Sequence, residues 1–179
     1  MPEPRPEPRP EPGPMPPPVP AAQEPFAAAC RRLGPRLMRD LGLSELQAAG
    51  LLGNLGRETG GFRHLQEVAP AVPGSRGGWG LAQWTGSRRV AMETWCRARG
   101  LDPADPEAGY GYLCAELRGP EAPALAALRA TTTLASATAA VWRRYERPGV
   151  VAARDRLAWA RRALAALRDA PAAPPPGSP

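Results

Sequence analysis

Apolar residues recur every three or four positions along most of the chain between residues 25 and 169. This spacing places them on one side of an α-helix, whereas a half-buried strand would show strict alternation. In the first such segment, residues 25–41, one face carries Phe26, Cys30, Leu33, Leu37 and Leu41. Gly42 follows this segment directly and predicts the end of the helix.

The same periodicity, combined with start and stop signals, predicts further helices along the chain. They cover approximately residues 44–59, 87–100, 105–117, 120–129, 133–146 and 151–169. Strand signals are weak throughout, and the Gly- and Pro-rich segment 60–86 is expected to form a loop with at most a short hairpin. The predicted fold class is therefore all-α, with six or seven helices around one buried central helix.

The segment 44–59 is the expected central helix. Ser44 and Gln47 have the spacing of a capping box at its start. Small residues, among them Gly50 and Gly53, leave room for neighbouring helices to approach its backbone. Since a glycine inside a helix costs about 1 kcal/mol relative to alanine, close packing must offset these glycines.

Four details of the other helices are also expected. Ser87 is the expected N-cap of the third helix, which carries Val90 on its apolar side. Asp105 is the expected N-cap of the fourth helix, with proline at the first helical position. The buried stripe of the fourth helix is expected to contain Tyr110, Leu113, Cys114 and Leu117. The buried stripe of the last helix is expected to contain Leu157, Ala160 or Arg161, Leu164 and Leu167.

The two ends of the chain differ in composition from its middle. Of the 25 prolines, twelve precede Phe26 and five follow Asp169. Proline lacks a backbone donor and fixes φ, so we expect residues 1–25 and 170–179 to be disordered or polyproline II tails. Residues 26–169 remain, and they suffice for one domain with its own core.

Composition also limits the chemistry. His64 is the only histidine, and the sequence has neither a CxxC nor an HExxH pattern, so we expect no metal site and no cofactor. The three cysteines lie in apolar, helical contexts that favour buried free thiols. No apolar run is long enough to span a membrane, and the N-terminus lacks the apolar part of a secretory signal. The net charge of +6 favours an anionic polymer, although arginines on solvated helix faces give the same balance.

Glu58 is the first candidate for chemistry, because it lies in the last turn of the predicted helix 44–59. The negative end of the helix dipole disfavours an ionised carboxylate there, and apolar neighbours such as Phe62, Trp79 or Trp84 would disfavour it further. A carboxylic acid that keeps its proton is what the cleavage of a glycosidic bond requires. The alternative is an acid that is exposed to solvent or paired with an arginine.

Gln83 is the second candidate, because an amide beside an indole is a common way to orient a sugar. The alternative for Gln83 is a loop residue that hydrogen-bonds to backbone. The aromatic candidates have an alternative as well, which is a place in the core of a small domain. These residues are Trp79, Trp84 and Tyr145.

Three blocks of the chain together resemble the phage tail lysozyme family. They are residues 53–60 (GNLGRETG), 80–88 (GLAQWTGSR) and 145–149 (YERPG). Their order and rough spacing match the family, and the likeness covers about residues 26–168. The first two blocks are also similar to motifs of lytic transglycosylases and goose-type lysozymes.

This resemblance implies a lysozyme-like α fold and cleavage of the β-1,4 bond between N-acetylmuramic acid and N-acetylglucosamine. It implies that Glu58 is the catalytic acid and that Gln83 lies near it in the substrate groove. Trp84 and Tyr145 are then expected as walls of the groove, and Trp79 and Gly80 are also assigned to substrate binding.

The sequence does not decide whether the site has a second catalytic carboxylate. Glu67 is the nearest acid after Glu58 and is the candidate for a second catalytic group across the groove. Without it, one acid acts twice, as in lytic transglycosylases; with it, hydrolysis follows. The segment 69–77 is an additional Pro- and Gly-rich stretch relative to the family, which leaves the edge of the groove undefined.

The expected function is a peptidoglycan-cleaving muramidase of phage or prophage origin that acts as a monomer. The alternatives are a non-catalytic wall-binding or tail structural module and, ranked last, an arginine-rich nucleic-acid binder. Bacterial peptidoglycan is the expected partner, with phage tail or particle proteins as partners of the Pro-rich tails; no nucleic acid and no membrane are expected. Without a signal, the protein is expected to be made in the cytoplasm and to reach the wall through a holin, lysis or delivery in a particle.

Overall fold

The computed structural model describes residues 25–67, 70, 74–146 and 153–169, and over these residues the fold is all-α, as predicted. Its helices are α1 (Pro25–Leu41), α2 (Glu45–Glu58), α3 (Gly86–Arg97), α4 (Pro106–Arg118), α5 (Ala122–Arg129), α6 (Leu134–Val141), the short π-helix η2 (Trp142–Glu146) and α7 (Ala153–Arg168). Apart from Pro25, the expected tails lie outside the described residues. None of the described helices is long and apolar enough to cross a bilayer.

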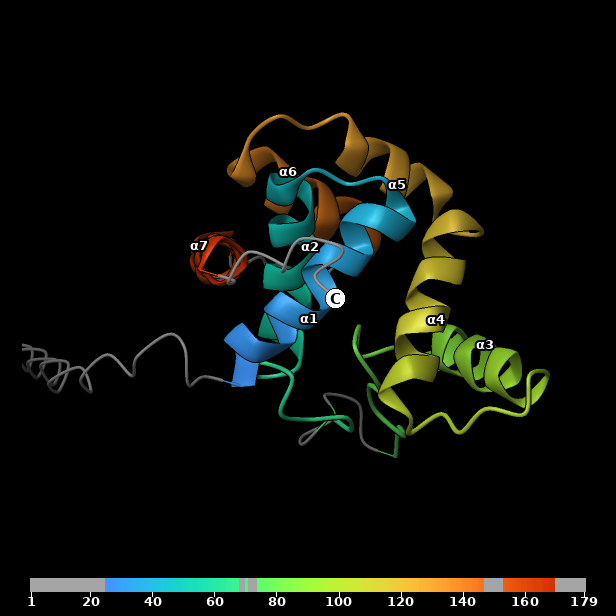
Figure 1. Ribbon diagram of the computed structural model, residues 1–179. Coiled ribbons are helices and arrows are strands. Elements are labelled where there is room, and N and C mark those ends of the chain that lie inside the picture. Colours follow the sequence, from blue (N-terminus) through green and yellow to red (C-terminus); the bar gives the residue numbers. More distant parts are fainter. Residues whose placement is uncertain (1–24, 68–69, 71–73, 147–152, 170–179) are drawn as a thin grey trace, which may run out of the picture.

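Helix α2 is the central element, as expected. Helices α1, α6 and α7 pack around it, while α3 and α4 lie on the other side of the molecule from α7 (Figure 1). The predicted capping box is present, because Ser44 Oγ accepts a hydrogen bond from the Gln47 backbone and Gln47 Oε1 accepts one from the Ser44 backbone. Every residue of α2 from Gln47 to Gly56 is buried.

Glycines bring the neighbouring helices onto the backbone of α2. A methyl group on Gly50 would lie 2.9 Å from Cβ of Ala137 in α6. A methyl group on Gly53 would overlap the backbone of Ala160 in α7. Because overlap of atoms is strongly repulsive and a gap forfeits dispersion contacts, these contacts fix the position of α2, including its last residue, against α6 and α7.

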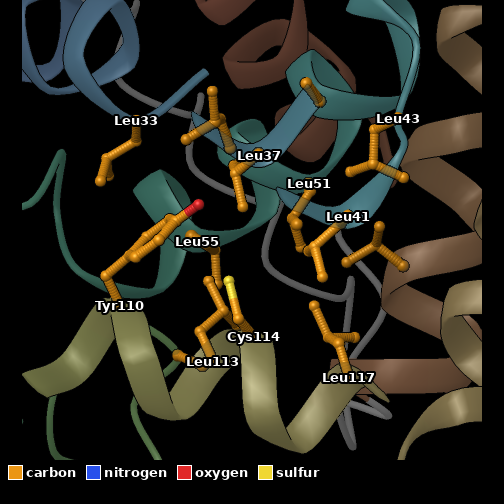
Figure 2. Packing of buried hydrophobic residues seen from close by; sticks show 14 of the residues in the cluster. Leu33, Leu37, Leu41, Leu43, Leu51, Leu55, Tyr110, Leu113, Cys114 and Leu117 are labelled. Atoms are coloured by element: carbon orange, nitrogen blue, oxygen red, sulfur yellow. The ribbon is translucent and has the colours of Figure 1, made fainter. Parts of the chain in front are cut away.

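The main hydrophobic core lies between α1, α2 and α4 (Figure 2). Its labelled members are Leu33, Leu37, Leu41, Leu43, Leu51, Leu55, Tyr110, Leu113, Cys114 and Leu117. The predicted faces of α1 and α4 are therefore confirmed. The cysteines are buried free thiols, as expected, and burial raises the pKa of Cys30 to about 12.

The helices differ from the prediction in two places. The N-cap of α3 is Thr85 rather than Ser87, and Val90 is exposed instead of buried. On α7 the buried residues are Arg156, Ala160, Ala163 and Ala166. The expected leucines Leu157, Leu164 and Leu167 are only half-buried, because the close contact of α7 with α2 admits small side chains and moves the larger ones to its edges.

Candidate active site

Glu58 is the last residue of α2, and its side chain is 25% exposed. Its Oε1 atom accepts a hydrogen bond from Arg156 Nη2 at 2.5 Å, and Arg57 Nη1 lies 3.6 Å from the same atom. Two positive charges therefore contact a carboxylate that the sequence analysis expected to find among apolar residues. The alternative in which this acid pairs with an arginine describes its contacts correctly.

Arg156 connects Glu58 to the interior of the protein. Its side chain comes from α7, is 1% exposed and also donates to Asn54 Oδ1 at 2.9 Å. Asn54 is fully buried in α2 and donates in turn to the carbonyls of Gly50 and Thr138. The Glu58 carboxylate is thus the partly exposed end of a buried polar chain that joins α2, α6 and α7.

A second carboxyl group, that of Glu146, lies close enough to Glu58 for their charges to interact. Glu146 ends η2 and keeps some exposure as a residue, but its Oε1 atom is buried and has no hydrogen-bond partner in the described part of the chain. Burial and then the charge of Glu58 raise the pKa of Glu146 to about 8, against opposing effects of Arg88 and Arg156. The carboxyl group of Glu146 is therefore largely protonated at neutral pH.

Trp84 and Tyr145 do not line a groove. Trp84 is fully buried, and its indole nitrogen donates to Glu116 Oε2 at 2.8 Å. Tyr145 is 1% exposed, and its hydroxyl donates to the same oxygen at 2.6 Å. The expectation that these two side chains form the groove wall is wrong, because each fills the core and satisfies a buried carboxylate.

Gln83 holds two parts of the loop between α2 and α3 together. Its backbone has a φ of 48°, which is uncommon for a residue other than glycine. Its Nε2 atom donates to the carbonyls of Gly80 at 2.9 Å and Leu65 at 3.2 Å, while the Gly80 amide also donates to Leu65. The amide nitrogen of Gln83 is thus occupied by backbone, and its role in substrate binding stays a prediction.

The expected minimal hairpin is present as isolated antiparallel bridges between Gln66 and Trp79 and between Trp79 and Trp84. The indole nitrogen of Trp79 donates to the Pro103 carbonyl at 3.0 Å, which ties the hairpin to the segment before α4. Glu67 accepts a hydrogen bond from the Gly78 amide at 2.7 Å. Glu67 therefore holds the hairpin, and its part as a second catalytic acid stays a prediction.

Sequence reasoning also missed the anchor of this hairpin on α3. Arg89 is buried, and its Nη1 atom donates to the carbonyls of Arg76 and Gly77, while its Nε atom binds Glu93. Arg76 forms a second ion pair with Glu93. These contacts give the Gly-rich segment a fixed position that its composition did not suggest.

A hollow of about 230 Å³ lies beside the hairpin. Its lining includes Thr59, Phe62, Leu65, Gly80 and Leu81. Thr59 directly follows Glu58, and its hydroxyl accepts a hydrogen bond from the Phe62 amide. The assignment of Gly80 to substrate binding is compatible with this hollow, whereas neither Glu58 nor Gln83 is among its lining residues.

Residues 35–167 match a family model described as phage tail lysozyme. The chain belongs to the phage tail lysozyme family. No curated protein and no solved structure matches it. Membership of the phage tail lysozymes gives the chain a lysozyme-like, cell-wall-acting function, with peptidoglycan as its substrate and an association with phage. The matched range contains Glu58, Glu67, Gln83 and Glu146, and it includes Arg156 on α7 as well.

Proposed function

We propose that the protein is a muramidase that cleaves the β-1,4 bond between N-acetylmuramic acid and N-acetylglucosamine, with Glu58 as the general acid. The observation that carries the proposal is the position of this carboxylate. It lies at the end of the buried central helix and is partly open to solvent. It accepts a hydrogen bond from the buried Arg156. A rigidly supported carboxyl group next to a surface loop is what a positioned proton donor requires.

In the proposed reaction, Glu58 protonates the glycosidic oxygen as the bond to the muramic acid breaks. The resulting Glu58 carboxylate then removes the proton from the C6 hydroxyl of the muramic acid, whose oxygen closes a 1,6-anhydro ring. This single-acid route is supported by the hydrogen bond that engages Glu67 with Gly78 in the hairpin. A hydrolase would need a second carboxylate placed to hold water on the opposite face of the sugar, whereas Glu67 uses its Oε2 atom to hold the hairpin.

Replacement of the acid tests the function. Glu58→Gln is expected to lower the rate of lysis of purified peptidoglycan at least ~100-fold, because general acid catalysis contributes that much or more. Glu45→Gln is the matched control, since it lies on the same helix about 20 Å away. If a folded Glu58→Gln protein lyses peptidoglycan at nearly the unchanged rate, Glu58 is not the acid.

The products distinguish the two routes. Mass spectrometry of digested peptidoglycan is expected to find muropeptides with 1,6-anhydro ends, lighter by one water than the products of hydrolysis. Reducing ends alone, combined with loss of lysis in a folded Glu67→Gln protein, would identify Glu67 as a second catalytic group and overturn the single-acid route.

A non-catalytic wall-binding or tail structural module is the second candidate, and the arginine contacts of Glu58 favour it. An acid that bonds to Arg156 and lies beside Arg57 serves to join α2 and α7 even without chemistry. The two functions differ in one assay. A structural module sediments with purified peptidoglycan and releases no soluble fragments, whereas the proposed muramidase releases them.

A further inference from the structure

A second hollow, of about 220 Å³, lies beyond the end of α2, and we call it the aromatic hollow. The residues that line it are Phe26, Gly60, Gly61, Arg63, Trp159 and Arg162. Gly60 is only two residues beyond Glu58, so their Cα atoms lie within about 8 Å of each other. On α7, Trp159 lies one helical turn from Arg156, which bonds to Glu58. The aromatic hollow is therefore a neighbour of the proposed catalytic acid.

Aromatic rings form part of this lining. Phe26 and Trp159 meet edge to face, with their ring centroids 4.8 Å apart. The guanidinium group of Arg162 lies over both rings, 4.1 Å from the centroid of Trp159 and 5.2 Å from that of Phe26. Trp159 is half-buried and Arg162 is exposed, so rings and charge are both within reach of a molecule in solution. Such a surface suits a ligand that combines apolar groups with carboxylates.

Another part of the lining is the tight turn that follows α2. Gly60, Gly61 and Phe62 have positive φ values of 59°, 80° and 63°. This conformation is uncommon for a bulky side chain such as that of Phe62, so the surrounding structure must hold it. A methyl group on Gly61 would lie 3.3 Å from the Trp159 ring. The glycine therefore keeps the aromatic hollow open, and the turn places Arg63 at its rim.

The charge of the aromatic hollow indicates what it binds. Two arginines line it, and no acidic residue of the described part of the chain does. Arg63 is exposed and forms no ion pair with any residue that the structure describes. Two positive charges at one hollow attract an anion. In peptidoglycan the glycan is neutral wherever its lactyl groups carry peptide, and the carboxylates lie on the stem peptides.

We propose that the aromatic hollow binds the stem peptide of peptidoglycan, with Arg63 and Arg162 pairing with its carboxylates and Trp159 contacting its apolar groups. This inference rests on the proposed function, because the peptide is attached to the muramic acid whose bond Glu58 cleaves. Two extended peptide residues reach about 7 Å, which is comparable with the separation of Glu58 and Gly60. The muramidase therefore prefers glycan that carries peptide to glycan from which the peptide has been removed.

The first test measures binding without lysis. The full chain, labelled with ¹⁵N, is titrated with the free stem tetrapeptide of alanine, glutamate, diaminopimelate and alanine, up to about 10 mM to cover a Kd of about 1 mM. The amide signals of Gly60 and Gly61 and the indole signal of Trp159 are expected to move. Arg63→Gln is expected to weaken binding about fivefold, as the loss of one exposed ion pair does. Arg161→Gln is the matched control, because Arg161 is an exposed arginine of α7 that does not line the hollow.

The titration overturns the proposal if none of these signals moves. It also does so if the tetrapeptide binds equally well after its carboxyl groups have been converted to amides, since the arginines then contribute nothing. Chitotetraose, a neutral glycan without peptide, is the competing probe. If it moves the same signals at lower concentration than the tetrapeptide, the aromatic hollow is a sugar subsite and the proposal is wrong.

The second test measures lysis. On intact peptidoglycan, Arg63→Gln is expected to raise KM about fivefold and to leave kcat unchanged, because it removes an interaction made equally in the ground state and the transition state. On glycan strands stripped of peptide by an amidase, Arg63→Gln is expected to match the unaltered protein. Equal effects on both substrates would mean that Arg63 does not act through the peptide, and they would overturn the proposal.

The two tests separate the inference from the function on which it rests. If Glu58→Gln still lyses peptidoglycan at full rate, the muramidase proposal fails, while the titration still decides whether the aromatic hollow binds the peptide. If Glu58→Gln abolishes lysis and the tetrapeptide moves no signal of the hollow, the inference alone fails.

Discussion

Two carboxylic acids, Glu116 and Glu146, lie near each other in the interior, and their surroundings differ. Glu116 is 2% exposed and accepts hydrogen bonds from Trp84, Tyr145 and Arg88, so both of its oxygens are engaged. Glu146 has a buried oxygen without a partner in the described part of the chain. One acid is thus fully paired, and the other is held in the protein at a cost.

The difference separates a fully paired cluster from one whose pairing is incomplete. A satisfied buried network rigidifies its surroundings, and that of Glu116 joins α3, α4 and η2. An incompletely satisfied group stores free energy that a change of protonation or a bound molecule releases. The Glu146 cluster has this property and lies at the acid that we propose as catalytic.

The same substitution in the two clusters is expected to have opposite effects. Glu116→Gln removes the negative charge beside Arg88 and should lower the free energy of unfolding by about 3–5 kcal/mol, as in other buried pairs that lose one member. Chemical denaturation at pH 7 measures this loss. A loss below about 1 kcal/mol would mean that the Glu116 network contributes little to stability. The contrast drawn between Glu116 and Glu146 would then be wrong.

Glu146→Gln is expected to increase stability at neutral and alkaline pH. The pKa of Glu146 is raised from 4.5 to about 8, so the unfolded chain binds fewer protons than the folded chain between these values. Stability therefore falls as pH rises through this window, by at most about 1.4 kcal/mol per pH unit, and levels off above it. Denaturation from pH 4 to 9 should show this decline in the unaltered protein and a smaller decline in Glu146→Gln.

The smallest expected effect is that of Tyr145→Phe. This change removes one of the donors to Glu116 and leaves the bonds from Trp84 and Arg88 in place, so it should cost about 1.5 kcal/mol. Thermal unfolding and lysis rates measured together are the check. The lysis rate should fall only in proportion to the folded fraction. A larger fall in the lysis rate would indicate that Tyr145 has a role in the active site.

Much of the fold was predictable because its signals are local. The bounds of α1, the capping box at Ser44 and the N-cap at Asp105 each depend on residues a few positions apart. The buried face of α7 was predicted only in part. Ala160 is buried as one of the expected residues, but the hydrophobic period favours leucines, which are only half-buried. The depth of contact with Gly53 of α2 selects alanines instead.

The candidate site was predictable in part, and for the same reason. Glu58 was identified from its place at a helix end, but its partner Arg156 is 98 positions away in the chain. An arginine on a helix face that also carries Ala160 and Ala163 gives no periodic signal of a buried charge. Glu146 lay within a block that resembled the family, yet only tertiary burial distinguishes it from the many exposed acids of the chain.

The glycines of α2 limit how this protein can be engineered. Replacing a helical glycine by alanine is a standard way to make an enzyme more heat-resistant, since it narrows the unfolded ensemble. At Gly53 the added methyl group would push Ala160 away. Ala160 lies one helical turn from Arg156, so the displacement would reach the contact with Glu58. Attempts at thermal improvement should therefore avoid this face of α2 and begin on the exposed positions of α3 and α5.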